Sequence, residues 1–136
     1  IGTDGCASNN DLDLFGEMRS AALVGKLVAN DAAAMSAASV LRAATMGSAR
    51  ALGWQDRIGS IEVGKQADLA AVDLGTIESQ PVYNVVSQLI YAAGRHQVSD
   101  VWIAGVRKLR NRELTGMDTT EILNKARRWR ERIATA

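Results

Sequence analysis

The residues best suited to chemistry lie at the start of the chain, in the sequence Thr3-Asp4-Gly5. Residues 1–3 can form an extended strand, and the Asp-Gly pair is typical of a turn that would end it. Catalytic groups of α/β barrels usually stand where a strand meets a loop. Asp4 is therefore a candidate catalytic carboxylate, although an aspartate in this position can also simply open a turn.

Four other side chains could take part in chemistry. Cys6 could act as a nucleophile, but no histidine lies near it in the sequence to activate it, so we interpret it as a small packing residue. Ser8 and Asn9 could contact a substrate or could simply form the entry to a helix. His96, the single histidine, follows a Gly-Arg pair in a polar turn, and we expect it on the surface rather than at a metal.

Composition sets limits on the kind of protein. The formal net charge of +1 gives no general attraction to nucleic acid or to a membrane. A single cysteine excludes an internal disulfide and suits a reducing compartment, which predicts a cytoplasmic protein. No apolar run is long enough to cross a bilayer. We interpret a basic run near the end as the solvated face of a helix rather than a nucleic-acid site: Lys125, Arg127, Arg128, Arg130 and Arg132.

Hydrophobic periodicity predicts two helices after the first loop. The first begins at Asn10 or Asp11 and ends near residues 30–31, and the second covers residues 36–52 and is capped by Ser36. The pattern then predicts a turn-rich stretch, a strand, an extended connector, a short helix and a two-stranded hairpin: residues 58–68, 67–74, 78–81, about 82–94, and 98–103 with 106–109.

A last helix is predicted to start at Asp118. Its apolar residues fall on one helical face, which we expect to pack against the body of the protein through Trp129: Ile122, Ala126, Trp129 and Ile133.

Three motifs carry a resemblance to a known family. Residues 44–53 have the form A-T-x-x-x-A-x-x-L-G, residues 59–69 read G-S-I-E-V-G-K-Q-A-D-L, and residues 98–105 fit V-x-x-V-W-x-x-G. Together with Gly2-Thr3-Asp4-Gly5 they resemble the C-terminal end of the amidohydrolase superfamily, the metal-dependent hydrolases built on a (β/α)₈ barrel. Residues 7–19 and 80–93 are most similar to the methylthioadenosine/S-adenosylhomocysteine deaminase branch of that superfamily.

The resemblance implies an α/β fold in which this chain is the C-terminal fragment of a barrel together with part of an adjoining small β-sandwich. Residues 1–57 would form the last barrel strand and the helices after it. Residues 58–117 would belong to the β-sandwich, with an inserted helix at about 82–94, and residues 118–136 would form the C-terminal helix. The chain opens inside what resembles a strand and has no initial Met, so we expect a longer protein.

The resemblance also implies a function. Asp4 would be a zinc ligand and proton shuttle, Ser8 and Asn9 would lie near the substrate, and the remaining ligands would be histidines of earlier strands that are absent here. The expected activity is zinc-dependent deamination of an adenine-type nucleoside, such as S-adenosylhomocysteine or methylthioadenosine, by a homo-oligomer. The alternatives are a guanine or triazine deaminase or hydrolase, and a non-catalytic structural fragment.

Overall fold

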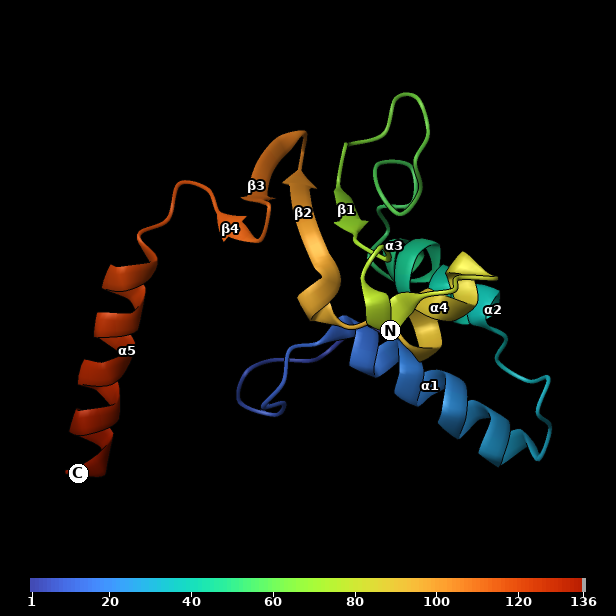
Figure 1. Cartoon of the computed structure of the whole chain (residues 1–136), viewed down its shortest axis with the longest axis horizontal. Helices are drawn as coiled ribbons and strands as arrows, with labels where there is room; N and C mark the ends of the chain where they lie inside the picture. Colours follow the sequence, from blue (N-terminus) through green and yellow to red (C-terminus); the bar gives the residue numbers. More distant parts are fainter. Residues whose placement is uncertain (136) are drawn as a thin grey trace.

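The computed structural model describes residues 1–135. A body of short helices lies beside a four-stranded antiparallel sheet, and a terminal helix stands apart from both (Figure 1). No helix of the described chain is both long enough and apolar enough to span a membrane.

The first helix, α1, covers Leu14–Ala29. It is capped by Asp13, whose carboxylate accepts a hydrogen bond from the Phe15 N–H at 3.0 Å. The prediction that Asn10 or Asp11 caps the helix is wrong, because residues up to 13 remain outside the helix. The end near residue 30 is confirmed: Asn30 takes a left-handed conformation with φ 49°, which suits a helix C-cap.

The second predicted helix is present but is interrupted. Helix α2 covers Ala37–Arg42, a π-helical turn covers Ala43–Gly47, and α3 covers Ser48–Ala51. The predicted cap is confirmed, since the Ser36 hydroxyl accepts a hydrogen bond from the Ser39 N–H at 3.3 Å. Hydroxyl bonds to the preceding turn accompany the wider π-helical geometry, including one from Ser48 Oγ to the Ala43 carbonyl at 3.1 Å.

A small apolar core joins these helices to α4, which covers Val85–Tyr91 and confirms the predicted short helix. The buried side chains come from α1, α2 and α4 and meet at their crossing: Met18, Ala22, Val40 and Ile90. This core fixes the first turns of α1, and those turns support the loop that contains Asp4.

The turn-rich stretch at 58–68 is confirmed, and it leads into β1, Leu69–Val72. The strand is shorter than predicted because aspartates at both ends serve neighbouring backbone groups. Asp68 accepts from the Ala104 N–H at 2.6 Å, and Asp73 accepts from the Gly75 N–H at 2.8 Å.

The connector before α4 differs from the prediction. Ile77–Ser79 forms a 3₁₀ turn rather than extended chain, closed by a bond from the Ser79 N–H to the Thr76 carbonyl at 3.0 Å. Gln80 is extended, as expected for a residue before proline.

The sheet has the order β1-β2-β3-β4, with every pair antiparallel. Its other strands are β2, Val98–Ile103, β3, Val106–Arg110, and β4, Glu113–Leu114. The predicted hairpin is confirmed, and its turn residues Ala104 and Gly105 both have positive φ, at 48° and 78°. This is the combination that a two-residue hairpin turn of right-handed twist requires.

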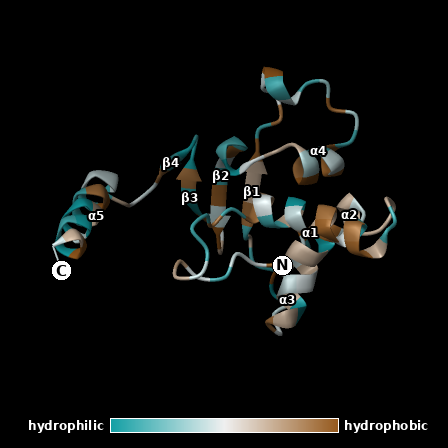
Figure 2. Cartoon of the chain, turned by 90° about the horizontal axis from the view of Figure 1, so that it is seen from below, coloured by the Kyte–Doolittle hydropathy of each residue, from teal (hydrophilic) through white to brown (hydrophobic). Residues whose placement is uncertain are grey.

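The last helix, α5, covers Thr119–Ala134, and its predicted cap is confirmed by a bond from the Glu121 N–H to Asp118 at 3.0 Å. The expectation that its apolar face packs on the body is wrong for the described residues. None of its side chains is buried, Trp129 is 55% exposed, and hydrophobic and hydrophilic residues alike face open space (Figure 2).

Residues 1–5 form no β-ladder with any described segment. A strand is stabilised by hydrogen bonds to a neighbouring strand, and none of the described strands lies beside these residues. The last barrel strand therefore stays a prediction.

Candidate active site

Asp4 lies in a tight loop that precedes α1. The N–H groups of Ser8 and Asn9 both donate to the Gly5 carbonyl at 3.0 Å, which closes the loop into a turn. The Gly5 N–H donates to Asp4 Oδ1 at 2.7 Å, and Asp4 itself has a φ of 60°. The Asp4 side chain is exposed, so its carboxylate is open to a ligand or a substrate.

The immediate neighbours of Asp4 favour its ionised form. The Ser8 hydroxyl, and after it the Gly5 N–H, hold the pKa of the Asp4 carboxyl below its usual value. The Ser8 hydroxyl also donates to the Gly5 carbonyl at 3.1 Å. Because a hydroxyl has one proton, the Ser8 hydroxyl can donate either to the Gly5 carbonyl or to the Asp4 carboxylate, whereas the Gly5 N–H donates to Asp4 Oδ1 throughout. An ionised carboxylate in this position can accept a proton or bind a cation through its oxygens.

Asn9 connects three segments around the loop, through bonds to Thr3, Glu17 and Asp11. Its side-chain amide donates to the Thr3 carbonyl at 2.8 Å and to Glu17 Oε1 at 2.9 Å, and its carbonyl oxygen accepts from the Asp11 N–H at 2.9 Å. Both amide protons of Asn9 are thus used within the protein. The structure gives Asn9 a structural role that the sequence did not reveal.

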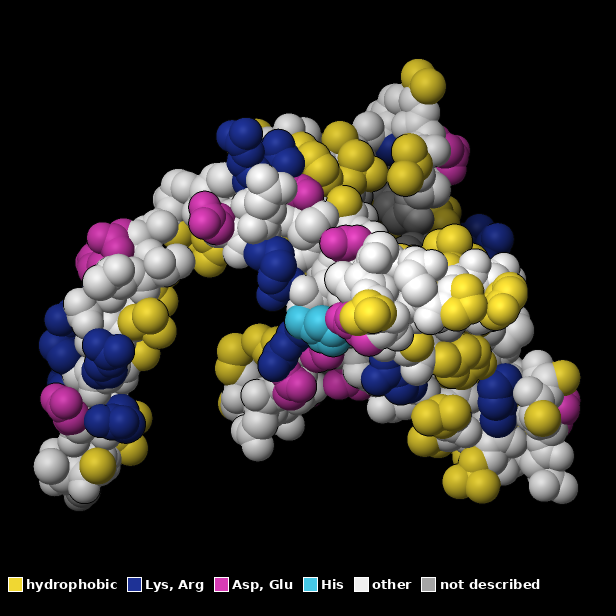
Figure 3. All heavy atoms as spheres, viewed as in Figure 1, with side chains coloured by type: hydrophobic (Ala, Val, Ile, Leu, Met, Phe, Trp, Pro, Cys, Tyr) yellow, Lys and Arg dark blue, Asp and Glu magenta, His cyan; other side chains and the backbone are white. Residues whose placement is uncertain are grey.

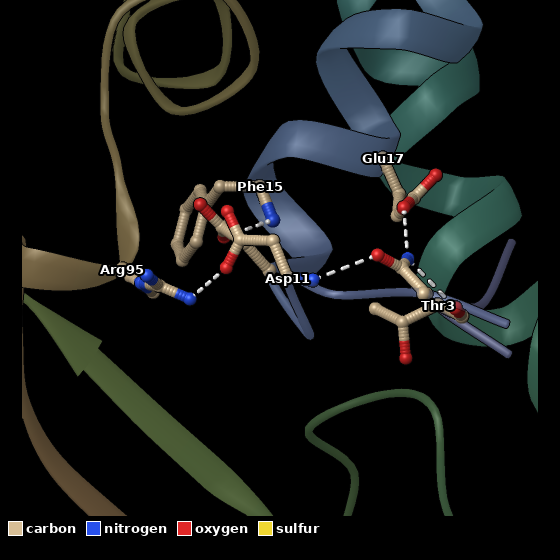
Figure 4. A network of polar contacts seen from close by, with 7 residues as sticks. Thr3, Asp11, Phe15, Glu17 and Arg95 are labelled. Atoms are coloured by element: carbon tan, nitrogen blue, oxygen red, sulfur yellow. Dashed lines mark hydrogen bonds and ion pairs between the residues drawn. The ribbon is translucent and has the colours of Figure 1, made fainter. Parts of the chain in front are cut away.

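A separate ion pair holds the end of the loop that leads into α1. Asp11 pairs with Arg95, which lies 84 residues later in the sequence, in the 3₁₀ turn Arg95–Gln97 before β2 (Figure 4). Both side chains are exposed, at 61% and 62%, so the pair contributes little to stability.

The structure brings together Asp4, Ser8 and Asn9, the three residues that the sequence singled out. Cys6 lies in the same loop and is exposed, so the interpretation of Cys6 as a packing residue is wrong for the described residues. His96 is exposed in the turn before β2, as expected. Sequence reasoning missed Glu17, because only the fold of the loop brings Asn9 beside the first turn of α1.

A complete metal site is absent from residues 1–135, which contain no group of three or more His, Cys, Asp or Glu side chains placed to hold a metal ion. Asp4 fits a single ligand position, since zinc accepts carboxylate oxygen. A separate apolar hollow of about 590 Å³ lies between the helices and β1. Neither Asp4, Ser8 nor Asn9 lines it, so it is distinct from the loop.

Comparison with known proteins yields related sequences along nearly the whole chain. The model of the Amidohydrolase family matches residues 1–108. A 5-methylthioadenosine/S-adenosylhomocysteine deaminase of Teredinibacter turnerae is 50% identical over 133 residues, which cover 98% of this chain and 30% of that protein. The corresponding deaminase of Saccharophagus degradans is 42% identical over the same shares of the two chains. The chain thus spans about 30% of the length of these curated relatives.

Solved structures of related proteins contain the same arrangement of helices and strands as this chain. The crystal structure of an adenosine deaminase from Xanthomonas campestris with bound zinc matches all of this chain and 31% of its own, with a TM-score of 0.96 and 68% identity. The zinc complex of the atrazine chlorohydrolase TrzN from Arthrobacter aurescens matches 89% of this chain and 27% of its own, with a TM-score of 0.81 and 31% identity. The first match covers α5 as well as the body.

Proposed function

The chain belongs to the amidohydrolase family, and on that premise we propose that it is the C-terminal part of a zinc-dependent deaminase of adenine-type nucleosides. We call the full-length polypeptide the parent protein. Its proposed substrates are S-adenosylhomocysteine and methylthioadenosine, the compounds named in the relatives. The observation that carries the proposal is Asp4, an exposed and ionised carboxylate in a loop of defined geometry.

The proposal extends to the architecture. Residues 1–57 would complete a (β/α)₈ barrel, residues 58–117 would belong to a β-sandwich, and residues 118–136, of which residue 136 lies outside the described part of the chain, would contribute the helix that follows it. The likeness to solved amidohydrolases supports this assignment. In such a barrel, residues 1–3 would gain the neighbouring strand that they need in order to form a ladder.

Asp4 would be one of the zinc ligands in the parent protein. A bound zinc ion supplies the Lewis acidity that makes water nucleophilic at neutral pH. Asp4 accepts the proton that the attacking water gives up and donates it to the departing amine. The oxygen of water replaces the amino group at C6 of the purine, and the products are ammonia and a hypoxanthine nucleoside.

Ser8 and Asn9 are proposed to lie near the substrate. The Ser8 hydroxyl is exposed on the same loop as Asp4, which supports a contact. Asn9 is half-buried with both amide protons in use, so any contact that it makes would use its carbonyl oxygen. The parent protein is further proposed to be a cytoplasmic homo-oligomer.

A triazine hydrolase is the second candidate. Its support is the likeness to the zinc complex of the atrazine chlorohydrolase, at 31% identity over 89% of this chain. The higher identity to the adenosine deaminase, 68% over the whole chain, favours the nucleoside.

The test is ammonia release by the purified parent protein from S-adenosylhomocysteine, methylthioadenosine, adenosine and guanine, and hydrolysis of a chlorotriazine. We expect activity on the adenosines, loss of activity after chelation, and recovery when zinc is added back. Activity on guanine or the triazine alone would overturn the choice of substrate. Full activity without bound metal would overturn the reaction class.

A further inference from the structure

We propose that Asn9 and Glu17 are positioning residues that hold the Asp4 carboxylate in its working orientation. The inference rests on the proposed function of Asp4 and adds two residues to it. Neither residue touches the Asp4 side chain. Their effect runs through the backbone that carries Asp4.

The first step is the bond from the Asn9 amide to the Thr3 carbonyl, 2.8 Å long. The Thr3 carbonyl and the Asp4 nitrogen belong to one planar peptide unit. A bond that fixes the carbonyl therefore fixes the unit from which the Asp4 side chain projects. This control matters because Asp4 has a φ of 60°, a left-handed conformation that is uncommon for non-glycine residues, although aspartate tolerates it better than most.

The second step is the bond from the same amide to Glu17 Oε1, 2.9 Å long. Glu17 lies in the first turn of α1, whose neighbouring turns contribute Met18 and Ala22 to the core. A hydrogen bond to a carboxylate is stronger than one between neutral groups. Glu17 therefore anchors Asn9 to α1, and this contact restricts the motion of the loop relative to the helix.

The positioning role belongs to the two N–H donors of the Asn9 side chain. Both protons of the Asn9 amide are committed to Thr3 and Glu17, and its oxygen already accepts from the Asp11 N–H (Figure 4). The Ser48 hydroxyl also bonds to the Ile1 carbonyl, at the start of the same segment, at 3.0 Å. A further attachment of the loop, the ion pair of Asp11 with Arg95, does not involve Thr3 or Asp4. Arg95 therefore provides a matched control that alters the loop without altering the support of Asp4.

The test uses the parent protein with Glu17→Ala, Glu17→Gln and Arg95→Gln. For each protein, kcat and KM for S-adenosylhomocysteine, zinc bound per chain after dialysis, and Tm are measured. Outer partners of this kind typically contribute about 10–100-fold to metal affinity or activity. We expect Glu17→Ala to lower kcat or zinc retention by that factor while KM changes by no more than about twofold. Glu17→Gln should recover most of the loss, because its amide oxygen can accept the same bond.

Arg95→Gln should match the parent protein in every measurement. Wild-type kcat and zinc content in Glu17→Ala would overturn the inference, and so would a Glu17→Gln protein as impaired as Glu17→Ala. If Glu17→Ala unfolds at the assay temperature, Asn9→Asp, which removes the donor to Thr3, is judged by the same criteria. If the parent protein deaminates none of the nucleosides, the proposed function fails, and zinc retention alone decides the inference.

Discussion

Asp4 has a left-handed backbone conformation, with φ 60°, in a loop where Gly5 donates directly to its carboxylate. A short polar side chain tolerates this conformation better than most, because it can bond to its own backbone neighbourhood. The Ser8 hydroxyl, and after it the Gly5 N–H, lower the pKa of the carboxyl. At the scale of single residues, the loop therefore orients the carboxylate that the proposed chemistry needs and favours its ionised form.

Asp100 is a buried carboxylate paired with an arginine, and it gives a prediction for the dependence of stability on pH. It is 8% exposed on β2 and accepts bonds from Arg107 Nε at 3.0 Å and from the Asn111 N–H at 3.2 Å. Arg107, followed by Ser99, lowers the pKa of the Asp100 carboxyl. Its contribution to stability is complete above the unfolded pKa of about 3.9 and is lost as pH falls through the lower folded pKa.

We therefore expect Asp100→Asn to lower the Tm of the parent protein at neutral pH and to flatten the fall of Tm below about pH 4. Thermal melts from pH 7 to pH 2 measure both effects. The control is Asp31→Asn, which changes an exposed carboxylate in the turn after α1. Equal acid slopes for Asp100→Asn and the parent protein would show that the Asp100 pair does not stabilise the fold.

Residue types and spacing located part of the site. Asp4, Ser8 and Asn9 are close in the sequence, so their presence in one loop followed from the turn residues between them. The partnership of Asn9 with Glu17 did not follow, because it depends on how the loop folds back onto α1. The N-cap of α1 was also predicted at the wrong residue. Several residues before α1 could have capped it, and Asp13 is the one whose backbone is extended at the start of the helix.

At the scale of elements, the turn at 58–68 packs against the helices through one of its glycines. Gly59 and Gly64 share a φ of 93°. A Cβ at Gly59 would lie 2.8 Å from the Ala49 Cβ and 3.2 Å from the Met46 Cα, whereas a Cβ at Gly64 would meet nothing within 4 Å. The turn thus sits directly on α3 and the π-helical turn at its Gly59 end and is open at its Gly64 end.

The two glycines form a matched pair for mutation. Gly64→Ala should destabilise the parent protein by about 1–3 kcal/mol, the usual cost of an unfavourable backbone conformation. Gly59→Ala should cost about 1–3 kcal/mol more, because the added methyl overpacks a contact with backbone and a short side chain. Denaturant melts measure the difference. Equal losses would mean that Gly59 is needed only for its backbone conformation and that the turn does not press on the helices.

Elements with strong local patterns were predicted well, and those decided by neighbours were not. The hairpin at Ala104-Gly105 and the start of α5 at Asp118 follow from turn and cap chemistry within a few residues. The π-helical turn within the second helix, the 3₁₀ turn at Ile77–Ser79 and the short strand β4 have no such pattern. Each depends on bonds or packing formed only after the chain has folded.

At the scale of the whole molecule, most large hydrophobic side chains lie outside the small core and are exposed. Only six hydrophobic residues are buried among those described, and hydrophobic side chains are exposed across the helical body (Figure 3). The apolar face of α5 is also exposed, with Arg132 over the Trp129 ring at 4.5 Å. Large exposed apolar areas are typical of interaction surfaces, which agrees with the proposed place of this chain within a longer protein.

The isolated chain should therefore bind zinc poorly. Asp4 has no partner ligands in residues 1–135, and one carboxylate does not form a zinc site. We expect no stoichiometric zinc after dialysis of the 136-residue chain against micromolar metal. Metal analysis, with the parent protein as the positive control, provides the measurement. One tightly held zinc per isolated chain would contradict the assignment of the other ligands to the rest of the parent protein.

The central claim is that Asp4 transfers the proton during deamination, and the most direct measurement is kcat of the Asp4→Asn parent protein with its zinc content determined. The change removes the base and nearly preserves the shape of the side chain, so kcat for S-adenosylhomocysteine should fall by about 10²–10⁴-fold while KM changes much less. Asp11→Asn makes the same chemical change at an exposed position of the same loop and should leave kcat unchanged. An Asp4→Asn protein that retains zinc and near-normal kcat would contradict the account.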